Sequence, residues 1–142
     1  MSKAALRDEI IRIAQEARAA ARVLASASTE QKQAALRAMA AGLRQDSGEI
    51  LAVNRKDVKQ ARAEGLSPPL IERLTLNEQR LSEMIASIEA LARLPDPVGE
   101  VVRRWRRPNG LQIRKVRVPL GVIGIIYESR PNVTSECASL CV

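Results

Sequence analysis

Apolar residues recur at every third or fourth position over most of residues 2 to 93, which is the period of an α-helix. Within each stretch the apolar positions gather on one face, as in a helix that packs against a core. The sequence therefore predicts a series of helices. Four of them carry these stripes: Leu6, Ile10, Ile13, Ala17, Ala20 and Leu24; Ala35, Leu36, Met39, Ala40 and Leu43; Leu51, Asn54, Val58 and Ala61; Leu81, Met84, Ile85, Ile88 and Leu91.

Capping signals mark where these helices begin and end. Ser28 followed by Gln31 has the spacing of a capping box and predicts the start of a second helix. The third helix follows an interruption at Gly48 and ends at Gly65. A short fourth helix opens at Ser67-Pro68, and Asn77 predicts the N-cap of a fifth.

The pattern changes after the Pro-Asp-Pro sequence at residues 95 to 97. Residues 101 to 107 and 111 to 118 read as extended segments on either side of Pro108-Asn109-Gly110, and Asn-Gly between two such segments is a strong hairpin signal. The alternation of apolar residues switches parity along the second segment, which predicts a β-bulge or a change of buried face near Arg114.

Residues 120 to 126 form an unbroken apolar run that is rich in β-branched side chains. Such a run is typical of a central parallel strand covered on both faces. Ligands bind just beyond the carboxyl ends of such strands, which would place a site at residues 127 to 132, followed by a helix. A parallel strand needs parallel neighbours, and no second run of this kind occurs upstream. We therefore expect a fragment, or partner strands on another chain.

Composition limits the class of protein. The 142 residues are 46% hydrophobic, enough for one globular core, but Trp105 and Tyr127 are the only aromatic residues. Two cysteines exclude a disulfide framework, and no apolar run reaches the length of a membrane span. The amino-terminal stretch contains acidic residues that a transit peptide would lack, so we expect a cytoplasmic protein.

The formal charge of +7 comes from one element, residues 103 to 117, which hold seven basic residues and no acidic one. A basic ribbon of this kind could follow the phosphates of a nucleic acid. The other interpretation is a solvated or subunit-facing hairpin, which the lack of interleaved aromatic residues favours.

Two residues after the apolar run have both structural and functional interpretations. Asn132 could cap the following helix, or its amide could donate to a developing oxyanion. Arg130 could form a surface ion pair, or hold an anionic group of a substrate. Cys137 and Cys141 lie at i and i+4, where they could hold a metal edge or present a thiol, although buried structural cysteines are the favoured interpretation. The chain has no histidine and no metal-spaced cluster of histidine and cysteine residues.

Residues 117 to 134 closely resemble the signature of γ-glutamyl phosphate reductase, also called glutamate-5-semialdehyde dehydrogenase, a member of the aldehyde dehydrogenase-like superfamily. The resemblance extends through residues 24 to 30, 54 to 57, 94 to 100 and 108 to 111. It therefore covers nearly the whole chain.

The resemblance implies an α/β fold of which this chain forms the amino-terminal portion. Residues 1 to 99 would be a helical segment of the cofactor domain and residues 100 to 118 a β-hairpin for oligomerisation. Residues 119 to 142 would be the first buried parallel strand, turn and start of a helix of the cofactor-binding domain.

The implied activity is the NADPH-dependent reduction of γ-glutamyl phosphate to glutamate 5-semialdehyde in proline biosynthesis, through a cysteine thioester. Asn132 would be the catalytic oxyanion donor, Arg130 and Glu128 would lie near the substrate, and Ile126 and Tyr127 beside the nicotinamide.

The family resemblance also implies a homo-oligomer of the full-length protein, while the residues themselves lead us to expect neither a metal nor nucleic acid. Neither cysteine aligns with the expected nucleophile and the chain stops at Val142, so we expect a fragment that is inactive alone. The alternative is a non-catalytic helical module that binds nucleic acid or another polyanion through residues 103 to 117.

Overall fold

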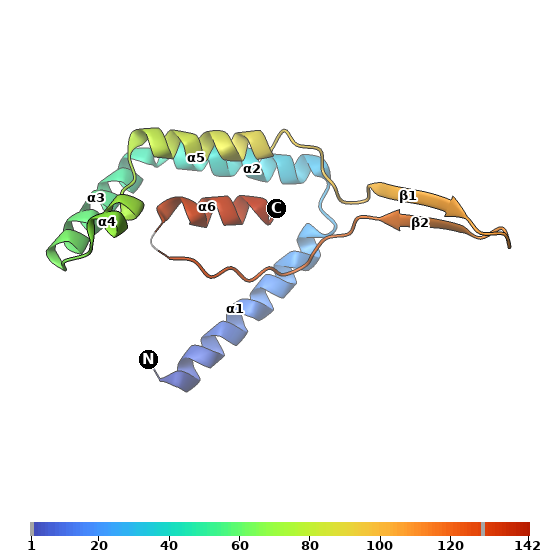
Figure 1. The fold of residues 1–142 in the computed structure, drawn as a ribbon, viewed down its shortest axis with the longest axis horizontal. Helices are drawn as coiled ribbons and strands as arrows, with labels where there is room; N and C mark the ends of the chain where they lie inside the picture. Colours follow the sequence, from blue (N-terminus) through green and yellow to red (C-terminus); the bar gives the residue numbers. More distant parts are fainter. Residues whose placement is uncertain (1, 129) are drawn as a thin grey trace. The chain divides into compact units, whose positions relative to one another are not determined.

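The computed structural model describes residues 2–128 and 130–142, and Figure 1 shows their helices and strands. Six helices and one two-stranded sheet form in these residues. In chain order they are α1 (Lys3–Leu24), α2 (Thr29–Gln45), α3 (Ser47–Ala63), α4 (Pro68–Leu74), α5 (Glu78–Leu91), β1 (Val101–Arg106), β2 (Gln112–Val116) and α6 (Pro131–Leu140).

The local signals of the sequence locate the helix ends well. The backbone amide of Ser28 donates to Oε1 of Gln31 at 2.8 Å, and the backbone amide of Gln31 donates to Oγ of Ser28 at 3.3 Å, so the predicted capping box is confirmed. Asn77 caps α5 as predicted. The break before α3 falls at Asp46 rather than at Gly48, because Gly48 fits within the first turn of the helix.

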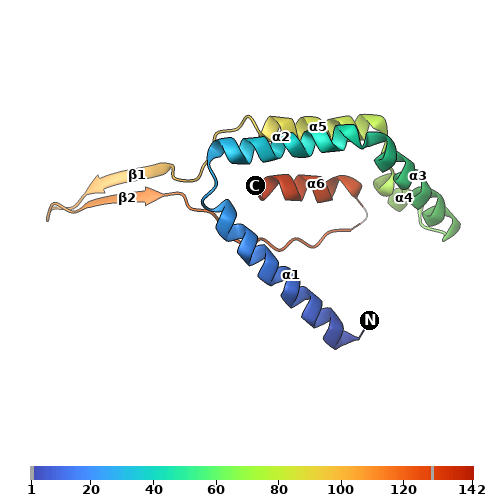
Figure 2. The same ribbon diagram turned by 180° about the vertical axis from the view of Figure 1, so that it is seen from behind.

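The described residues divide into two units. The helical unit comprises residues 28–94 and 124–142, and in it α2 and α5 lie side by side, with α6 against α5 and α4 against α3 (Figures 1 and 2). Aliphatic side chains from these helices make its core, with no aromatic ring. The buried members are Leu36, Ala40, Leu51, Leu76, Leu81, Met84, Ile85, Ile88 and Ala92, and a smaller cluster holds Val58, Ala61 and Ile71.

The hairpin unit comprises residues 2–27 and 95–123, and so contains α1, β1 and β2. No residue of α1 is buried, and its predicted apolar stripe is largely exposed, with Ile10 at 56% of its full accessibility. On its polar side Arg12 pairs with Glu9 and Glu16, each at 2.6 Å. The hydrogen bond from Arg12 lowers the pKa of Glu9 below its ordinary value.

The predicted hairpin is confirmed. β1 and β2 pair antiparallel, with Trp105 opposite Ile113. Gly110 has φ +88°, a left-handed conformation that suits glycine in the turn. The irregularity in the ladder lies between Val101 and Arg103, at the far end of the hairpin, and not near Arg114 as predicted.

The prediction of a buried strand at residues 120 to 126 is wrong for this chain. These residues adopt no regular secondary structure, and Leu120 and Ile126 are 88% and 103% exposed. The physical reason is that a strand is stabilised by neighbours that share its backbone hydrogen bonds, and β1 and β2 pair only with each other among the described residues.

Candidate functional site

A cleft of about 410 Å³ lies in the helical unit, between the α4–α5 turn and the beginning of α6. It brings together Arg130 and Asn132, two of the residues singled out from the sequence. Charged side chains of both signs surround them. We call this the α6 cleft, and its lining residues are Glu72, Arg73, Thr75, Leu76, Arg80, Glu83, Met84, Ser87, Arg130, Pro131, Asn132 and Glu136.

Asn54 of α3 holds the α4–α5 turn, which forms one wall of the α6 cleft. Asn54 is 6% exposed, and its Nδ2 donates to the carbonyl oxygen of Leu74 at 2.9 Å while its Oδ1 accepts from the amide of Leu76 at 2.7 Å. One amide side chain thus satisfies a donor and an acceptor of the turn's backbone, in a place where unpaired groups would be costly.

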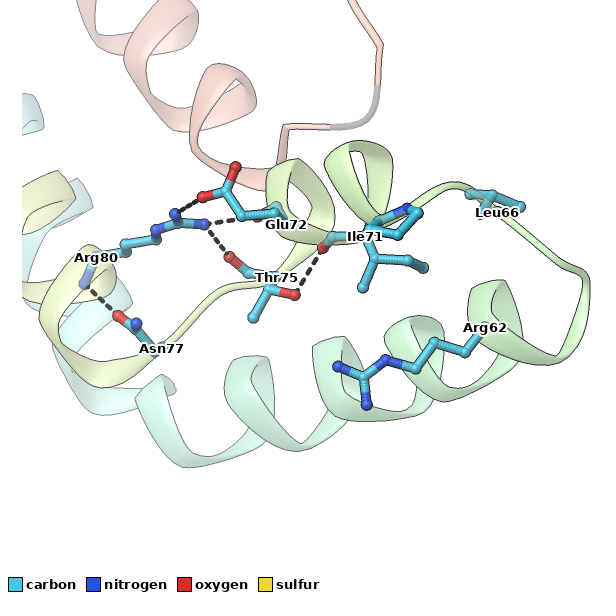
Figure 3. A pocket seen from close by; sticks show the side chains of 8 residues that line it. Arg62, Leu66, Ile71, Glu72, Thr75, Asn77 and Arg80 are labelled. Carbon is cyan, nitrogen blue, oxygen red and sulfur yellow. Dashed lines mark hydrogen bonds and ion pairs between the residues drawn. The ribbon is translucent and has the colours of Figure 1, made fainter.

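Arg80 of α5 holds the same turn from the other side. Its Nη1 donates to the carbonyl oxygens of Glu72 at 2.8 Å and Thr75 at 2.7 Å, and its Nη2 pairs with the Glu72 carboxylate. Figure 3 shows the guanidinium turned toward Glu72 and Thr75. Because Asn77 also accepts from the Arg80 amide at 2.8 Å, the turn and the start of α5 are tied together.

A second hollow of about 520 Å³, the α3 groove, opens beside this turn (Figure 3). It shares Glu72, Thr75 and Arg80 with the α6 cleft, so the Glu72–Arg80 ion pair borders both. Its other residues are Arg62, Leu66, Pro68, Ile71 and Asn77. The Arg62 side chain extends below Ile71 and Thr75 in the view of Figure 3.

The first turn of α6 forms the remaining wall of the α6 cleft. Arg130 is the N-cap residue and Pro131 the first helical residue, so the structure corrects the interpretation of Asn132 as a cap. Proline is favoured at the first helical position, because its missing amide proton has no partner there anyway. Asn132 consequently lies one residue inside the helix.

The Asn132 side chain is held by Glu136, one helical turn further along. Nδ2 of Asn132 donates to Oε1 of Glu136 at 3.0 Å, and both residues are half-buried. An amide nitrogen carries two protons. The bond to Glu136 uses one of them.

The other predicted site residues lie outside the α6 cleft. Ile126 is fully exposed, and the hydroxyl of Tyr127 lies 2.8 Å from Oγ1 of Thr134, an exposed residue of α6. Glu128 is exposed, and its carbonyl oxygen accepts from the Arg130 amide at 2.7 Å. Of the predicted site residues only Arg130 and Asn132 line the cleft, and nothing in the sequence indicated the cleft residues from α4 and α5.

Both cysteines are free thiols. Cys137 is half-buried and Cys141 is exposed, so the interpretation as buried structural cysteines is wrong for Cys141, which follows the last helical residue. Within residues 2–128 and 130–142, no group of three or more metal-ligating side chains could hold an ion. None of the helices in that part of the chain is both long and apolar enough to cross a membrane.

The hairpin presents its basic residues to solvent. Arg103 lies 5.4 Å from the centre of the Trp105 ring, a cation–π distance, and Arg117 pairs with Glu100 at 2.8 Å. Arg103 therefore lies against the Trp105 ring, which is still 38% exposed.

No protein-family model matches the chain. Curated relatives do: it is 54% identical over 135 residues to a protein named γ-glutamyl phosphate reductase from Carboxydothermus hydrogenoformans, covering 95% of this chain and 32% of the relative. It is 56% identical over 128 residues to the protein of the same name from Moorella thermoacetica, covering 90% of this chain and 31% of that one. The chain thus spans about a third of the length of these relatives.

Two solved structures agree in fold. The crystal structure of γ-glutamyl phosphate reductase from Thermotoga maritima superposes with a TM-score of 0.88 at 48% identity, covering 93% of this chain and 32% of that one. The protein of the same name from Saccharomyces cerevisiae gives 0.87 at 32% identity, covering 91% and 33%.

Proposed function

The chain corresponds in sequence and fold to the amino-terminal third of γ-glutamyl phosphate reductases, and we propose that it forms this part of such an enzyme. The proposed reaction is the NADPH-dependent reduction of γ-glutamyl phosphate to glutamate 5-semialdehyde in proline biosynthesis, in the cytoplasm. The observation that carries the proposal is that Asn132 and Arg130 line one cleft. The alternative of a polyanion-binding helical module is not favoured by the relatives.

Asn132 is proposed to stabilise the oxyanion that forms when a thiolate adds to the γ-carboxyl carbon, before this oxyanion collapses to a thioester and expels phosphate. Its amide already donates one proton to Glu136 at 3.0 Å, which leaves the second proton of the same nitrogen for the oxyanion. A donor held in place before the reaction needs little reorganisation when charge develops, and this is the property that makes an oxyanion hole effective.

Arg130 is proposed to attract the anionic groups of the substrate. It lines the cleft, its side chain makes no cap hydrogen bond, and a guanidinium binds carboxylate and phosphate oxygens through paired donors. Arg73 lines the same cleft and adds positive charge. Glu128 remains a proposed substrate neighbour, with weaker support because it does not line the cleft.

Ile126 and Tyr127 are proposed neighbours of the nicotinamide of NADPH, the group that supplies the hydride. The exposed aliphatic side chain of Ile126 could pack against a planar ring. Neither residue lines the α6 cleft or the α3 groove, so by themselves they do not make a dinucleotide site. We also propose that neither Cys137 nor Cys141 is the nucleophile, and that this chain alone does not turn over substrate.

The hairpin is proposed to join subunits of a homo-oligomer. Both strands have an unpaired edge among the described residues, and an exposed edge can add a strand from another chain. The basic side chains would then meet acidic groups of a second subunit.

A chimera tests the enzymatic proposal. This chain would replace the matching segment of the Moorella thermoacetica relative, and phosphate-dependent reduction of NADP by glutamate 5-semialdehyde would be followed by absorbance. The chimera should be active, whereas its Asn132→Ala variant should lose about 10²-fold or more in kcat, the usual cost of removing one oxyanion donor.

A folded but inactive chimera would refute the proposed function, and an unchanged kcat of the Asn132→Ala variant would refute the role of Asn132. The unmodified relative and the melting temperature of each protein serve as controls.

A further inference from the structure

Glu136 is the one residue of the α6 cleft that the structure shows bonded to the Asn132 side chain. The two residues lie four positions apart on α6, where side chains of one helix face meet. Both line the cleft and both are half-buried, and 3.0 Å separates Nδ2 of Asn132 from Oε1 of Glu136.

The chemistry of this pair fixes the direction of the amide. An ionised carboxylate only accepts hydrogen bonds, whereas an asparagine side chain has a donating and an accepting end. The carboxylate of Glu136 therefore selects the orientation in which the amide nitrogen of Asn132 faces the carboxylate. With the orientation reversed, the carbonyl oxygen of Asn132 would face the carboxylate and the nitrogen would be turned away.

We propose that Glu136 is a positioning residue that orients the Asn132 amide as a hydrogen-bond donor toward the bound acyl group. The inference rests on the proposed function, because it assumes that Asn132 serves an oxyanion. Glu136 itself would not touch the reacting atoms. A hydrogen bond to a charged group is stronger than one between neutral groups, so it favours one amide orientation over the other.

The alternative is that the pair only supports the helix. Amide–carboxylate pairs at this spacing occur elsewhere in the chain, as Nε2 of Gln60 donates to Oε1 of Glu64 at 2.8 Å on α3 and the following turn. Glu64 lines neither hollow, so Glu64→Gln removes the same charge from the same kind of pair away from the site. It is a matched control for Glu136→Gln.

The first experiment measures the kinetics of the chimera. The glutamine of Glu136→Gln can either donate or accept a hydrogen bond, so it no longer selects one orientation of the Asn132 amide. We expect kcat to fall about tenfold, while KM changes less than twofold. Glu136→Asp keeps an acceptor-only group and should retain most of kcat, and Glu64→Gln should retain all of it. In the Asn132→Ala background, Glu136→Gln should cause no further loss, because residues that act as one unit are not additive.

The second experiment uses the 142-residue chain itself. The side-chain amide protons of Asn132 should shift in the NMR spectrum on Glu136→Gln and stay in place on Glu64→Gln. Unchanged Asn132 signals, an unchanged kcat, or an additive loss in the double variant would each overturn the inference. An inactive chimera would refute the proposed function instead, and the NMR result would still decide whether Glu136 orients the amide.

Discussion

The substitution Asn54→Ala tests most directly how the α4–α5 turn is held. Alanine removes both side-chain hydrogen bonds, the one given to the Leu74 carbonyl at 2.9 Å and the one accepted from the Leu76 amide at 2.7 Å. Leu76 is 6% exposed, so water cannot easily replace the partner of its amide.

The expected cost follows from these two orphaned groups. A buried donor left without a partner costs about 1–3 kcal/mol, and the Leu74 carbonyl, which is only half-buried, adds about 1 kcal/mol. The total of about 2–4 kcal/mol is a large share of the roughly 5–15 kcal/mol that stabilises a typical domain. Asn77→Ala, which removes only an exposed cap, should cost about 1 kcal/mol.

Urea unfolding of the 142-residue chain, followed by far-ultraviolet circular dichroism, measures both free energies of unfolding. Hydrogen exchange of the Leu76 amide gives a local readout, and its protection should fall in Asn54→Ala but not in Asn77→Ala. The reasoning is refuted if Asn54→Ala costs no more than Asn77→Ala, or if the Leu76 amide keeps its full protection.

Three further predictions concern the rest of the chain. Ser28→Ala should cost about 1 kcal/mol, and NMR titration should show the pKa of Glu30 rising toward its ordinary value of 4.5, because the Ser28 hydrogen bond is the main cause of its lowering. The lowered pKa of Glu30 stabilises the fold above pH 4.5, and this stabilisation is lost as the pH falls through the pKa of the folded state. The variant should therefore lose this part of its sensitivity to acid. An unchanged Glu30 pKa would contradict the prediction. Gly110→Ala places a side chain on a residue with φ +88° and should destabilise the hairpin by about 1–2 kcal/mol. Denaturation followed by the fluorescence of Trp105 measures this loss, and an unchanged denaturation curve would contradict the expected strain. Residues 103 to 117 should retain nucleic acid only weakly at physiological salt, and tight binding with a steep salt dependence in a fluorescence titration would support the polyanion-binding alternative.

The features predicted correctly from the sequence depend on residues close together in the chain. The capping box of Ser28, the cap at Asn77 and the turn at Asn109-Gly110 each satisfy their own backbone within a few residues. Residues 120 to 126 differ, because a strand forms only where other strands complete its hydrogen bonds, and the composition of the run cannot supply them.

The candidate site shows the same division. Pro131 was a usable signal that Arg130, and not Asn132, ends the loop, since proline favours the first helical position. Asn54 was also visible as a polar residue within an apolar stripe. Arg80 gave no such signal, because its partners at Glu72 and Thr75 are brought to it by the packing of α4 against α3 and by the turn.

The Glu72–Arg80 ion pair borders both the α6 cleft and the α3 groove, so any ligand that shifted this pair would act on both hollows. A molecule in the α3 groove that favoured one arrangement of this pair would change affinity in the α6 cleft by some factor. Reciprocity then requires that a ligand in the α6 cleft change affinity in the groove by the same factor. A ligand in the groove that favoured one arrangement of the ion pair would thus change the proposed binding at Arg130 and Asn132 without occupying their cleft.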